Sequence, residues 1–416
     1  MKLLHAADLH IDSPLRGLSR YEGAPADQLR GATRQALENL VTLALEEEVT
    51  AVLLAGDIYD GDWPDYNTGL FFTRQMTRLC DAGIPVYLIA GNHDAANLMT
   101  RTLTASLPKN VHYFPTERPA TVVDEQRGLA VHGQGFAQRE VRANLAEHYP
   151  APRSGLFNVG LLHTALTGRE GHEPYAPCRI DQLVDHGYEY WALGHVHQRQ
   201  VEYDADVKVV FPGNIQGRNV REAGPKGCTL VTVDDRHRVT GLRHHDLDTA
   251  ARWHELRVDV RSARDVSDVL TLVSEQLDKE LAGDTEPNRV HAVRVVVEGP
   301  TDAHEQLHRD HEKLLNELRA IAAQRPDTWL EKLRVKTSPP EERLDAAHAD
   351  ELVGELWRTA ARLSASPEQL TEVIASAELL GKLPLQLREE LSDPQRQRDL
   401  LAEAVELLAA ELGGAQ

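Results

Sequence analysis

Side chains that can bind metal ions lie in five short clusters between residues 8 and 197, each directly after an apolar run. The clusters are Asp8-Leu9-His10, Gly56-Asp57-Ile58-Tyr59-Asp60, Gly91-Asn92-His93-Asp94, His163 and Gly194-His195-Val196-His197. The candidate ligands among them are Asp8, His10, Asp57, Asn92, His163, His195 and His197. Oxygen and nitrogen donors in this mixture suit Mn, Fe or Zn better than Ca. The set predicts metal-assisted hydrolysis of a phosphate ester.

We expect two ions at this site. Two ions about 3.5–4 Å apart need one ligand that contacts both. A carboxylate can bridge two ions and an imidazole cannot, so Asp57 is the natural bridge. Such a pair lowers the pKa of a bound water, holds a phosphoryl oxygen and keeps the nucleophile in line.

His93 is expected to differ from the ligands. It follows Asn92, so its side chain should point away from the metals if Asn92 points toward them. A histidine in that place can donate a proton to the leaving oxygen. Asp94 could orient it, as a neighbouring carboxylate that fixes a tautomer does. The alternative is that His93 is a loop residue that makes a hydrogen bond only.

The clusters differ in how specific they are. Gly91-Asn92-His93-Asp94 is the strongest, because its polar side chains have no apolar packing role. Asp-x-His is common by chance, and Asp57 and Asp60 could be ordinary loop carboxylates. Together they favour a site over a set of capping and turn residues, since ligands of open α/β sheets gather beyond the carboxyl ends of strands.

The apolar runs alternate with longer amphipathic segments up to about residue 200, which predicts a layered α/β fold. The expected strands are Leu3–Ala7, Ala51–Ala55, Val86–Ala90, Phe157–Leu162 and Tyr190–Leu193, with helices over Leu29–Glu48 and Thr68–Ala82. Three β-rich runs follow without a helix between them: Val207–Phe211, Cys228–Val233 and Val239–His245. They predict an antiparallel portion that closes the domain.

Beyond residue 250 the pattern starts again. A β-α-β-α-β order is expected over Trp253–Val260, Asp265–Leu281, His291–Val297, Ala303–Ala323 and Trp329–Lys336. Ser338-Pro339-Pro340 indicates a linker. Helices are then expected over Asp345–Leu363, from Pro367 onward and over Asp393–Leu412. We predict three parts: residues 1–250, 251–338 and 339–416.

Composition narrows the class of protein. Of 416 residues, 41% are hydrophobic and 26% charged, as in a globular protein with a sizeable core. The net charge of −20 argues against a broad polyanion-binding surface. Three scattered cysteines predict no disulfide framework, and no apolar run is long enough to span a membrane. The first strand leads straight to Asp8, so we expect no signal peptide and a cytoplasmic location.

The clusters, in this order, resemble those of the calcineurin-like metallophosphoesterase superfamily. Within it, the chain resembles the DNA-repair exonuclease branch, the SbcD-type nuclease subunits, and more closely their shorter YhaO-type relatives. The segments that carry this resemblance are Leu4–Leu15, Ala55–Asp60, Ala90–Asp94, Leu162–Ala165, Tyr175–Cys178 and Phe211–Arg218. The resemblance covers about residues 1–245.

The resemblance implies a four-layer sandwich of two mixed β-sheets flanked by helices. The pattern beyond residue 250 adds a small α+β capping-type domain and a helical C-terminal segment. It implies two divalent ions, most often Mn²⁺. One ion would be held by Asp8, His10, Asp57 and His197, and the other by Asp57, Asn92, His163 and His195. His93 is implied as the catalytic histidine and Asp94 as its partner.

The implied function is a DNA exonuclease of the repair type that works with an SbcC-type coiled-coil ATPase, bound near the C-terminus. The tail helices, with apolar stripes and acidic faces, could dock that partner or pack on the protein itself. A phosphoesterase for a small nucleotide or a phosphoprotein is the first alternative. A scaffold that keeps its metals for stability is the second.

Residues around the clusters suggest contacts to substrate. Arg218, in a Gly-rich loop after the last cluster, is the best candidate for a phosphate contact. The weaker candidates, each of which could equally be ordinary solvated surface, are Arg16, Arg20, Arg30 and Arg34 after the first cluster and Arg199, Arg221 and Lys226 after the last. Tyr59 could stack on a base or ribose, or pack as an ordinary core aromatic.

Overall fold

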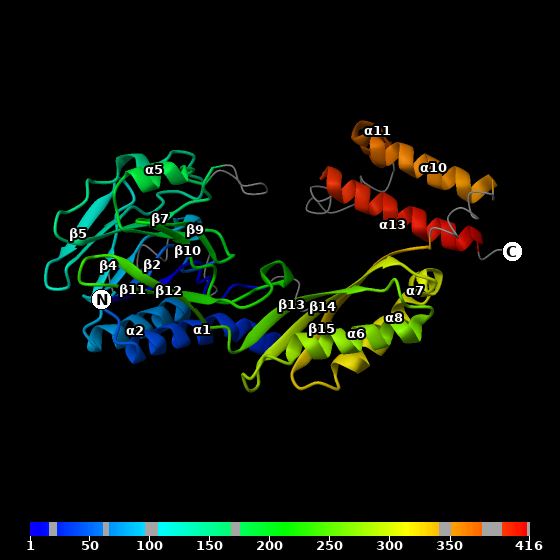
Figure 1. Cartoon of the computed structure of the whole chain (residues 1–416), viewed down its shortest axis with the longest axis horizontal. Coiled ribbons are helices and arrows are strands. Elements are labelled where there is room, and N and C mark those ends of the chain that lie inside the picture. The colour runs from blue at the N-terminus through cyan, green and yellow to red at the C-terminus, as the bar shows by residue number, and fades with distance from the viewer. Residues whose placement is uncertain are drawn as a thin grey trace. The chain divides into compact units, whose positions relative to one another are not determined.

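The structure, a computed structural model, describes residues 1–15, 23–60, 66–95, 107–167, 175–340, 351–376 and 393–413. Two mixed sheets face each other, with helices on their outer sides (Figure 1). The first sheet has the order β12 (Val239–Asp246), β11 (Gly227–Val233), β1 (Lys2–Ala6), β2 (Ala51–Leu54), β3 (Val86–Leu88) and β4 (Val111–Tyr113). The second has the order β5 (Ala120–Asp124), β6 (Leu129–Gly133), β7 (Phe157–His163), β8 (Tyr190–Gly194), β10 (Lys208–Phe211) and β9 (Gln200–Asp204). The predicted fold class is confirmed.

Strand β1 shows why the layers form. Leu3 and Leu4 are both fully buried, but successive side chains of a strand point to opposite faces. Leu3 packs in the core between the sheets, with residues such as Leu161 of β7. Leu4 packs in the core on the other face, with residues such as Leu37 of α1. A strand covered on both faces therefore reads as a continuous apolar run.

Helices cover the outer faces of both sheets. The buried residues of α1 (Ala26–Glu46) include Leu37, Leu40, Val41 and Ala44, a spacing that gives one apolar stripe against the first sheet. Helix α2 (Asn67–Asp81) adds Phe72 to the same core. The short helix α5 (Ile180–Asp185) packs on the second sheet.

Strand direction brings the loops of interest together. Strands β1 to β4 are parallel to one another, and so are β6, β7, β8 and β10. Strand β11 pairs antiparallel with β1, and β12 pairs antiparallel with β11, as expected. The run at Val207–Phe211 differs, because β10 lies parallel to β8 in the second sheet and its antiparallel neighbour is β9.

The described residues divide into two compact units. The first comprises Met1–Glu255, Thr285–Val293 and Arg325–Glu331, and the second comprises Leu256–Asp284, Arg294–Gln324 and Lys332–Gln416. The border falls within the strands of a third sheet, ordered β13 (Ala251–Asp259), β14 (Val290–Pro300) and β15 (Thr328–Ser338). The three-part division at residues 250 and 338 stays a prediction.

The helices after β13 follow the predicted order. Helix α6 (Val266–Leu281) lies between β13 and β14 in sequence. The helix expected over Ala303–Ala323 is broken into α7 (His304–Arg309) and α8 (His311–Ala322), because Asp310 leaves the helical conformation with φ −101° and ψ 28°. The tail forms α10 (Glu351–Ala365), α11 (Pro367–Ser376) and α13 (Pro394–Gly413). Residues 345–350 of the first expected tail helix lie outside the described residues. No described helix is long and apolar enough to cross a membrane.

Candidate metal centre

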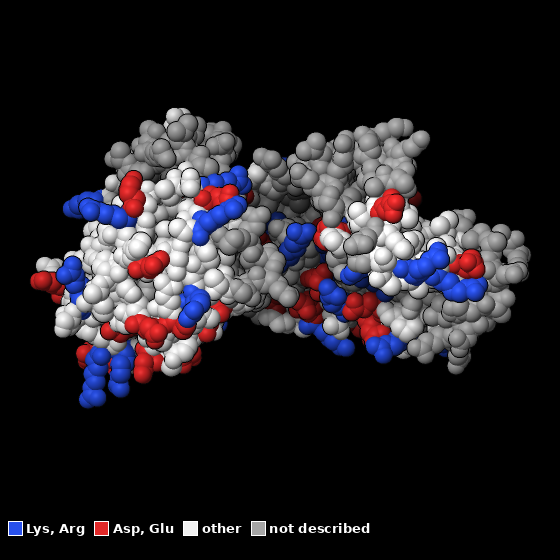
Figure 2. Space-filling model, turned by 90° about the horizontal axis from the view of Figure 1, so that it is seen from above, with Lys and Arg blue, Asp and Glu red and all other residues white. Residues whose placement is uncertain are grey.

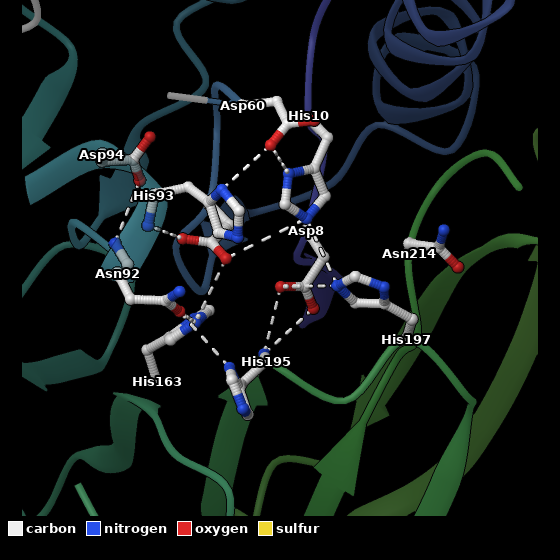
Figure 3. Close-up of polar contacts among 12 residues, drawn as sticks. Asp8, His10, Asp60, Asn92, His93, Asp94, His163, His195, His197 and Asn214 are labelled. Atoms are coloured by element: carbon white, nitrogen blue, oxygen red, sulfur yellow. Dashed lines mark hydrogen bonds and ion pairs between the residues drawn. The ribbon is translucent and has the colours of Figure 1, made fainter. Parts of the chain in front are cut away.

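The five clusters meet beyond the carboxyl ends of β1, β2, β3, β7 and β8 (Figure 3). Backbone hydrogen bonds join them: the N–H of Asp8 donates to Gly56 O and that of His10 to Asp57 O, both at 3.0 Å. The His195 N–H donates to both carboxylate oxygens of Asp8, at 3.0 and 3.1 Å. All seven side chains predicted as ligands are therefore brought together, as the strand-end rule requires.

Asp8, His10 and His197 form what we call the first metal position. The Nε2 atoms of the two histidines lie 3.2 Å apart, and His197 Nε2 lies 3.8 Å from Asp8 Oδ1. One ligand atom from each of the three lies within 4.8 Å of the others. Nitrogens of two rings and a carboxylate oxygen that face one another in this way can surround one cation.

Asn92, His163 and His195 form the second metal position. Asn92 Oδ1 lies 3.0 Å from His163 Nε2 and 3.3 Å from His195 Nδ1. His163 Nδ1 donates to the Ala55 carbonyl oxygen at 2.8 Å. A neutral His163 therefore carries its lone pair on Nε2, the atom that faces Asn92.

Asp57 lies between the two positions. Its Oδ2 is 3.9 Å from His10 Nε2 and 3.5 Å from His163 Nε2. Its Oδ1 accepts the backbone N–H of His93 at 2.9 Å, which holds the carboxylate in place. This is the placement that a bridging carboxylate requires, and the bridging role itself stays a prediction.

The charges of the site fit divalent cations. Asp8 and Asp57 are each 1% exposed, and within the described residues their ion pairs go to histidines. Burial raises the pKa of Asp8; burial also opposes the charged form of Asp57, yet His163 and His10 hold the pKa of Asp57 well below its usual range. Burial lowers the pKa of His163, but Asp57 outweighs it and raises that pKa to about 9. A proton on His163 thus balances the Asp57 carboxylate, and a metal ion can replace that proton.

The backbone of the site is strained. Asp8, His10, Asp57 and His195 have φ values of 53°, 42°, 51° and 99°. This left-handed region is uncommon for residues other than glycine. Such strain persists where the surrounding structure enforces it, and it gathers at functional sites. The hydrogen bonds between the clusters supply that constraint here.

Gly91 shows why the third cluster needs a glycine. A Cβ built on it would lie 2.1 Å from Asp57 Oδ1 and 2.5 Å from Asp57 N. Any side chain would therefore displace the candidate bridging carboxylate. The glycine allows the loop after β3 to touch the loop after β2.

His93 pairs with a carboxylate other than the one expected. Its Nδ1 lies 2.9 Å from Asp60 Oδ1, and its ring meets that of His10 edge-on at 4.9 Å. Burial lowers the pKa of His93, but the hydrogen bond to Asp60 outweighs it and raises that pKa. In this structure Asp60 orients His93, and the assignment of Asp94 as its partner is corrected.

Asp94 instead holds two loops together. Its carboxylate accepts the backbone N–H groups of Gly91 and Tyr59 at 3.0 Å and of Ile58 at 3.2 Å. It lies on the short helix α3 (Asn92–Ala95), which turns the side chain back toward these amides and away from His93. Asp94 is 4% exposed and joins the second cluster to the third.

Tyr59 is a core residue. It is 5% exposed, and its ring packs edge-on against Phe72 of α2 at 5.9 Å. Burial raises the pKa of its hydroxyl well above the usual value. The face of the Tyr59 ring is therefore not accessible to a nucleotide. Tyr59 packs as a core aromatic, which is the second of the two expectations for it.

Arg218 lies beside the first metal position, held by carboxylates. Its Nη2 donates to Glu222 Oε1 at 2.8 Å, and its Nη1 lies 3.4 Å from Asp60 Oδ2. Glu222 was not among the residues predicted from the sequence, although its Oε1 accepts a hydrogen bond from His197 Nδ1 at 2.8 Å. It lies 25 residues after His197 in the chain, outside every cluster, so no spacing signals it.

Arg34 is also engaged. Its guanidinium donates to both oxygens of Asp12, at 2.7 and 2.6 Å. Arg16 and Arg20 lie outside the described residues.

Two protein families match this chain. Residues 1–199 match calcineurin-like phosphoesterases, and residues 253–338 match the family described as metallophosphoesterase YhaO, middle domain. The chain is 34% identical over 283 residues to the uncharacterized metallophosphoesterase YhaO of Bacillus subtilis (strain 168), a match that covers 67% of this chain and 68% of that protein. The chain belongs to the calcineurin-like metallophosphoesterases.

More distant relatives include two proteins with named roles. An SbcCD nuclease subunit of Bacillus subtilis (strain 168) is 25% identical over 267 residues, covering 56% of this chain and 66% of that protein. DNA double-strand break repair protein Mre11 of Aeropyrum pernix is 27% identical over 247 residues, covering 55% and 57%. The chain thus spans somewhat less than two thirds of their length. The crystal structure of TT1561 of Thermus thermophilus overlaps with a TM-score of 0.35 at 17% identity, covering 59% of this chain and 98% of that chain.

Proposed function

We propose that this metallophosphoesterase is a DNA exonuclease with two divalent ions, most favourably Mn²⁺. The observation that carries the proposal is the placement of Asp57 between two groups of ligand atoms, with His93 beside them. The ions, when bound, would activate water and clamp the phosphoryl oxygens. That chemistry suits phosphodiester hydrolysis.

The chain's own residues would divide the work. Asp8, His10, Asp57 and His197 would hold one ion, and Asp57, Asn92, His163 and His195 the other. His93 uses Nδ1 for Asp60, so its Nε2 is the atom that would carry a proton to the leaving sugar oxygen. Asp60 would keep the ring aimed at that oxygen.

DNA as substrate is supported by two of the relatives, a nuclease subunit and a DNA break repair protein. On the face that Figure 2 draws, the described Lys and Arg side chains are scattered among Asp and Glu. Phosphate contacts would then lie close to the metals. Arg218 stays a predicted contact, although two carboxylates already engage it.

The proposed partner is an SbcC-type coiled-coil ATPase, and the proposed docking segment is the helical tail, residues 339–416. Helices α11 and α13 contact each other through Thr371 Oγ1, which donates to Gln397 Oε1 at 2.9 Å. Val373, Leu407 and Leu408 are about half exposed on these helices, at 50%, 55% and 51%. Exposed apolar side chains of this kind suit a helical partner. The cytoplasmic location also stays a prediction.

End-labelled DNA tests the proposal. We expect Mn-dependent release of label from single- or double-stranded DNA, which stops when the end is blocked. A small chromogenic phosphodiester, assayed in parallel, tests the alternative that the enzyme acts on a small phosphate ester. Cleavage of the small ester alone would overturn the nuclease proposal and favour a small-substrate phosphoesterase. A metal-loaded protein inert toward every ester would favour a scaffold.

A further inference from the structure

The segment from Gly213 to Lys226 surrounds His197. Asn214 N–H donates to the carbonyl oxygen of His197 at 3.4 Å, and Lys226 Nζ donates to the same oxygen at 2.9 Å. Gly213 has φ 80°, and a Cβ there would lie 3.0 Å from Arg199 N and 3.1 Å from His197 O. A side chain at this glycine would therefore push the segment away from the histidine.

Glu222 is the centre of this segment. Its carboxylate accepts hydrogen bonds from His197 Nδ1 at 2.8 Å, Asn214 Nδ2 at 2.9 Å and the Arg218 backbone N–H at 2.8 Å. The Arg218 side chain also donates to it through Nη2, at 2.8 Å. The Glu222 side chain is 9% exposed, so these bonds are shielded from water and hold their geometry.

Two neighbours of His197 Nδ1 favour opposite tautomers. A carboxylate only accepts, so Glu222 at 2.8 Å requires a proton on Nδ1. A guanidinium only donates, so Arg218 Nη2 at 3.2 Å requires a lone pair there. Glu222 is closer, and Arg218 Nη2 already donates to it. The proton therefore stays on Nδ1.

We infer that Glu222 is a positioning residue that keeps the Nδ1 proton on His197, so that the lone pair of Nε2 faces Asp8 and His10. Nε2 lies 3.2 Å from His10 Nε2 and 3.8 Å from Asp8 Oδ1. A histidine that binds a metal through one nitrogen commonly donates its other N–H to a carboxylate in this way. The inference rests on the proposal that His197 is a metal ligand.

The effect is confined to one of the two positions. In the second position the Nδ1 proton of His163 goes to the backbone carbonyl of Ala55, which no substitution of a side chain removes. Without Glu222, Arg218 would donate to His197 Nδ1 and move the proton to Nε2, the atom that would bind the first ion. Removal of Arg218 as well would relieve that conflict.

The tautomer is measured in the metal-free protein. Long-range ¹H–¹⁵N correlation spectra of histidine-labelled protein at alkaline pH should show the proton of His197 on Nδ1. Glu222→Ala should move it to Nε2, and Glu222→Gln should retain part of the Nδ1 form, because its amide oxygen still accepts. Asp248→Asn is the matched control: Asp248 is fully buried and pairs with Arg252 four residues away, at 2.6 and 2.8 Å.

Binding of Mn²⁺, followed by calorimetry, is the second readout. Glu222→Ala should weaken the binding of one of the two Mn²⁺ ions by about 10- to 100-fold and leave the affinity for the other unchanged. Asp248→Asn should change neither. The double variant, Glu222→Ala with Arg218→Ala, should bind this more weakly held ion more tightly than Glu222→Ala alone does. If the segment had a purely structural role, the double variant would instead bind that ion more weakly than Glu222→Ala does.

An unchanged tautomer and unchanged Mn²⁺ affinity in Glu222→Ala would overturn the inference. If that variant does not fold, Glu222→Gln decides, with about 10-fold weaker binding of one ion expected and wild-type binding contradicting it. His197→Ala separates the two proposals. If it binds both ions as tightly as the wild type, the ligand assignment itself fails; if only Glu222 proves dispensable, the assignment stands without the inference.

Discussion

The two metal positions are supported in different ways. At the first, a side-chain carboxylate, Glu222, holds the ring of His197. At the second, the backbone carbonyl of Ala55 holds the ring of His163. A backbone partner comes with the strand and cannot be substituted, whereas a side-chain partner can be tuned or lost by one mutation. We therefore expect substitution of a partner residue to adjust metal affinity at the first position more readily than at the second.

The two metal positions also differ in the elements that supply and hold their residues. The second position draws on the ends of β7 and β8 and on the loop after β3. The first draws on the loops after β1 and β8, and it depends in addition on the segment from Gly213 to Lys226, which contacts His197 through Asn214 and Lys226. Rigid strand ends place ligands more tightly than loops do. The following experiments test how far this difference reaches.

Asp57→Asn should have the largest effect, since Asp57 lies between both positions. We expect both ions to bind more than about 100-fold more weakly and turnover to be lost. This effect exceeds that of removing a residue that only hydrogen-bonds to a ligand. Calorimetry with Mn²⁺ measures the first and release of label from DNA the second. If one ion still binds with wild-type affinity, Asp57 is not shared and the two positions are independent.

His93→Ala should come next. His93 is not a predicted ligand of either ion, so Mn²⁺ binding should be unchanged. The rate of DNA cleavage should fall by about 10²- to 10⁴-fold. Single-turnover cleavage with saturating Mn²⁺ measures this rate. Wild-type cleavage by this variant would remove His93 from the mechanism.

Asp60→Asn compared with Asp94→Asn asks which carboxylate serves His93. Asp60→Asn should lower kcat by about 10- to 100-fold with little change in KM or metal affinity. Asp94→Asn should instead lower the free energy of unfolding by about 1–3 kcal/mol, because buried N–H groups lose part of their acceptor. The reverse result, a kcat effect from Asp94 alone, would contradict the pairing seen here.

Addition of metal should stabilise the fold, because a divalent cation offsets the negative charge of the buried Asp8 and Asp57 carboxylates. At a free Mn²⁺ concentration of 100 times Kd, one site adds about 2.7 kcal/mol to the free energy of unfolding. His197→Ala and His163→Ala should each lose part of this gain. Thermal unfolding with Mn²⁺ or with chelator tests this stabilisation. A melting temperature that does not change with Mn²⁺ would show that metal binding does not stabilise the fold.

The smallest effect should come from His132, which lies in β6 away from both positions. Burial lowers its pKa to about 4, and it bonds Thr121 and Asn158 in the neutral form. The unfolded chain binds the proton near pH 6.5, so stability is lost as the pH falls from about 6.5 toward 4, by about 1–3 kcal/mol. Urea unfolding of wild type and His132→Gln across this range should show a shallower loss for the variant, with chelator present throughout.

Much of the fold follows from local pattern. The expected strands agree with β1, β2, β3, β7 and β8 to within two residues at each end. Strands β4, β5, β6 and β9 were not predicted. Strands β4, β5 and β9 are short and only partly buried, so their sequences carry no strong apolar run. Strand β6 is buried, but its sequence Leu-Ala-Val-His-Gly is short and ends in two residues that are not apolar. The pairing of β10 with β8 depends on contacts between distant segments, which no local pattern encodes.

The sequence by itself determined the set of candidate metal ligands, because each follows an apolar strand and parallel strands end at one edge. Only the tertiary structure decided their partners. Helix α3 turns Asp94 toward three backbone amides, which leaves Asp60 to pair with His93. Glu222 reaches His197 through a fold of the chain rather than a motif. A ligand is selected by its chemistry at a strand end, whereas its partner is selected by packing between segments far apart in sequence.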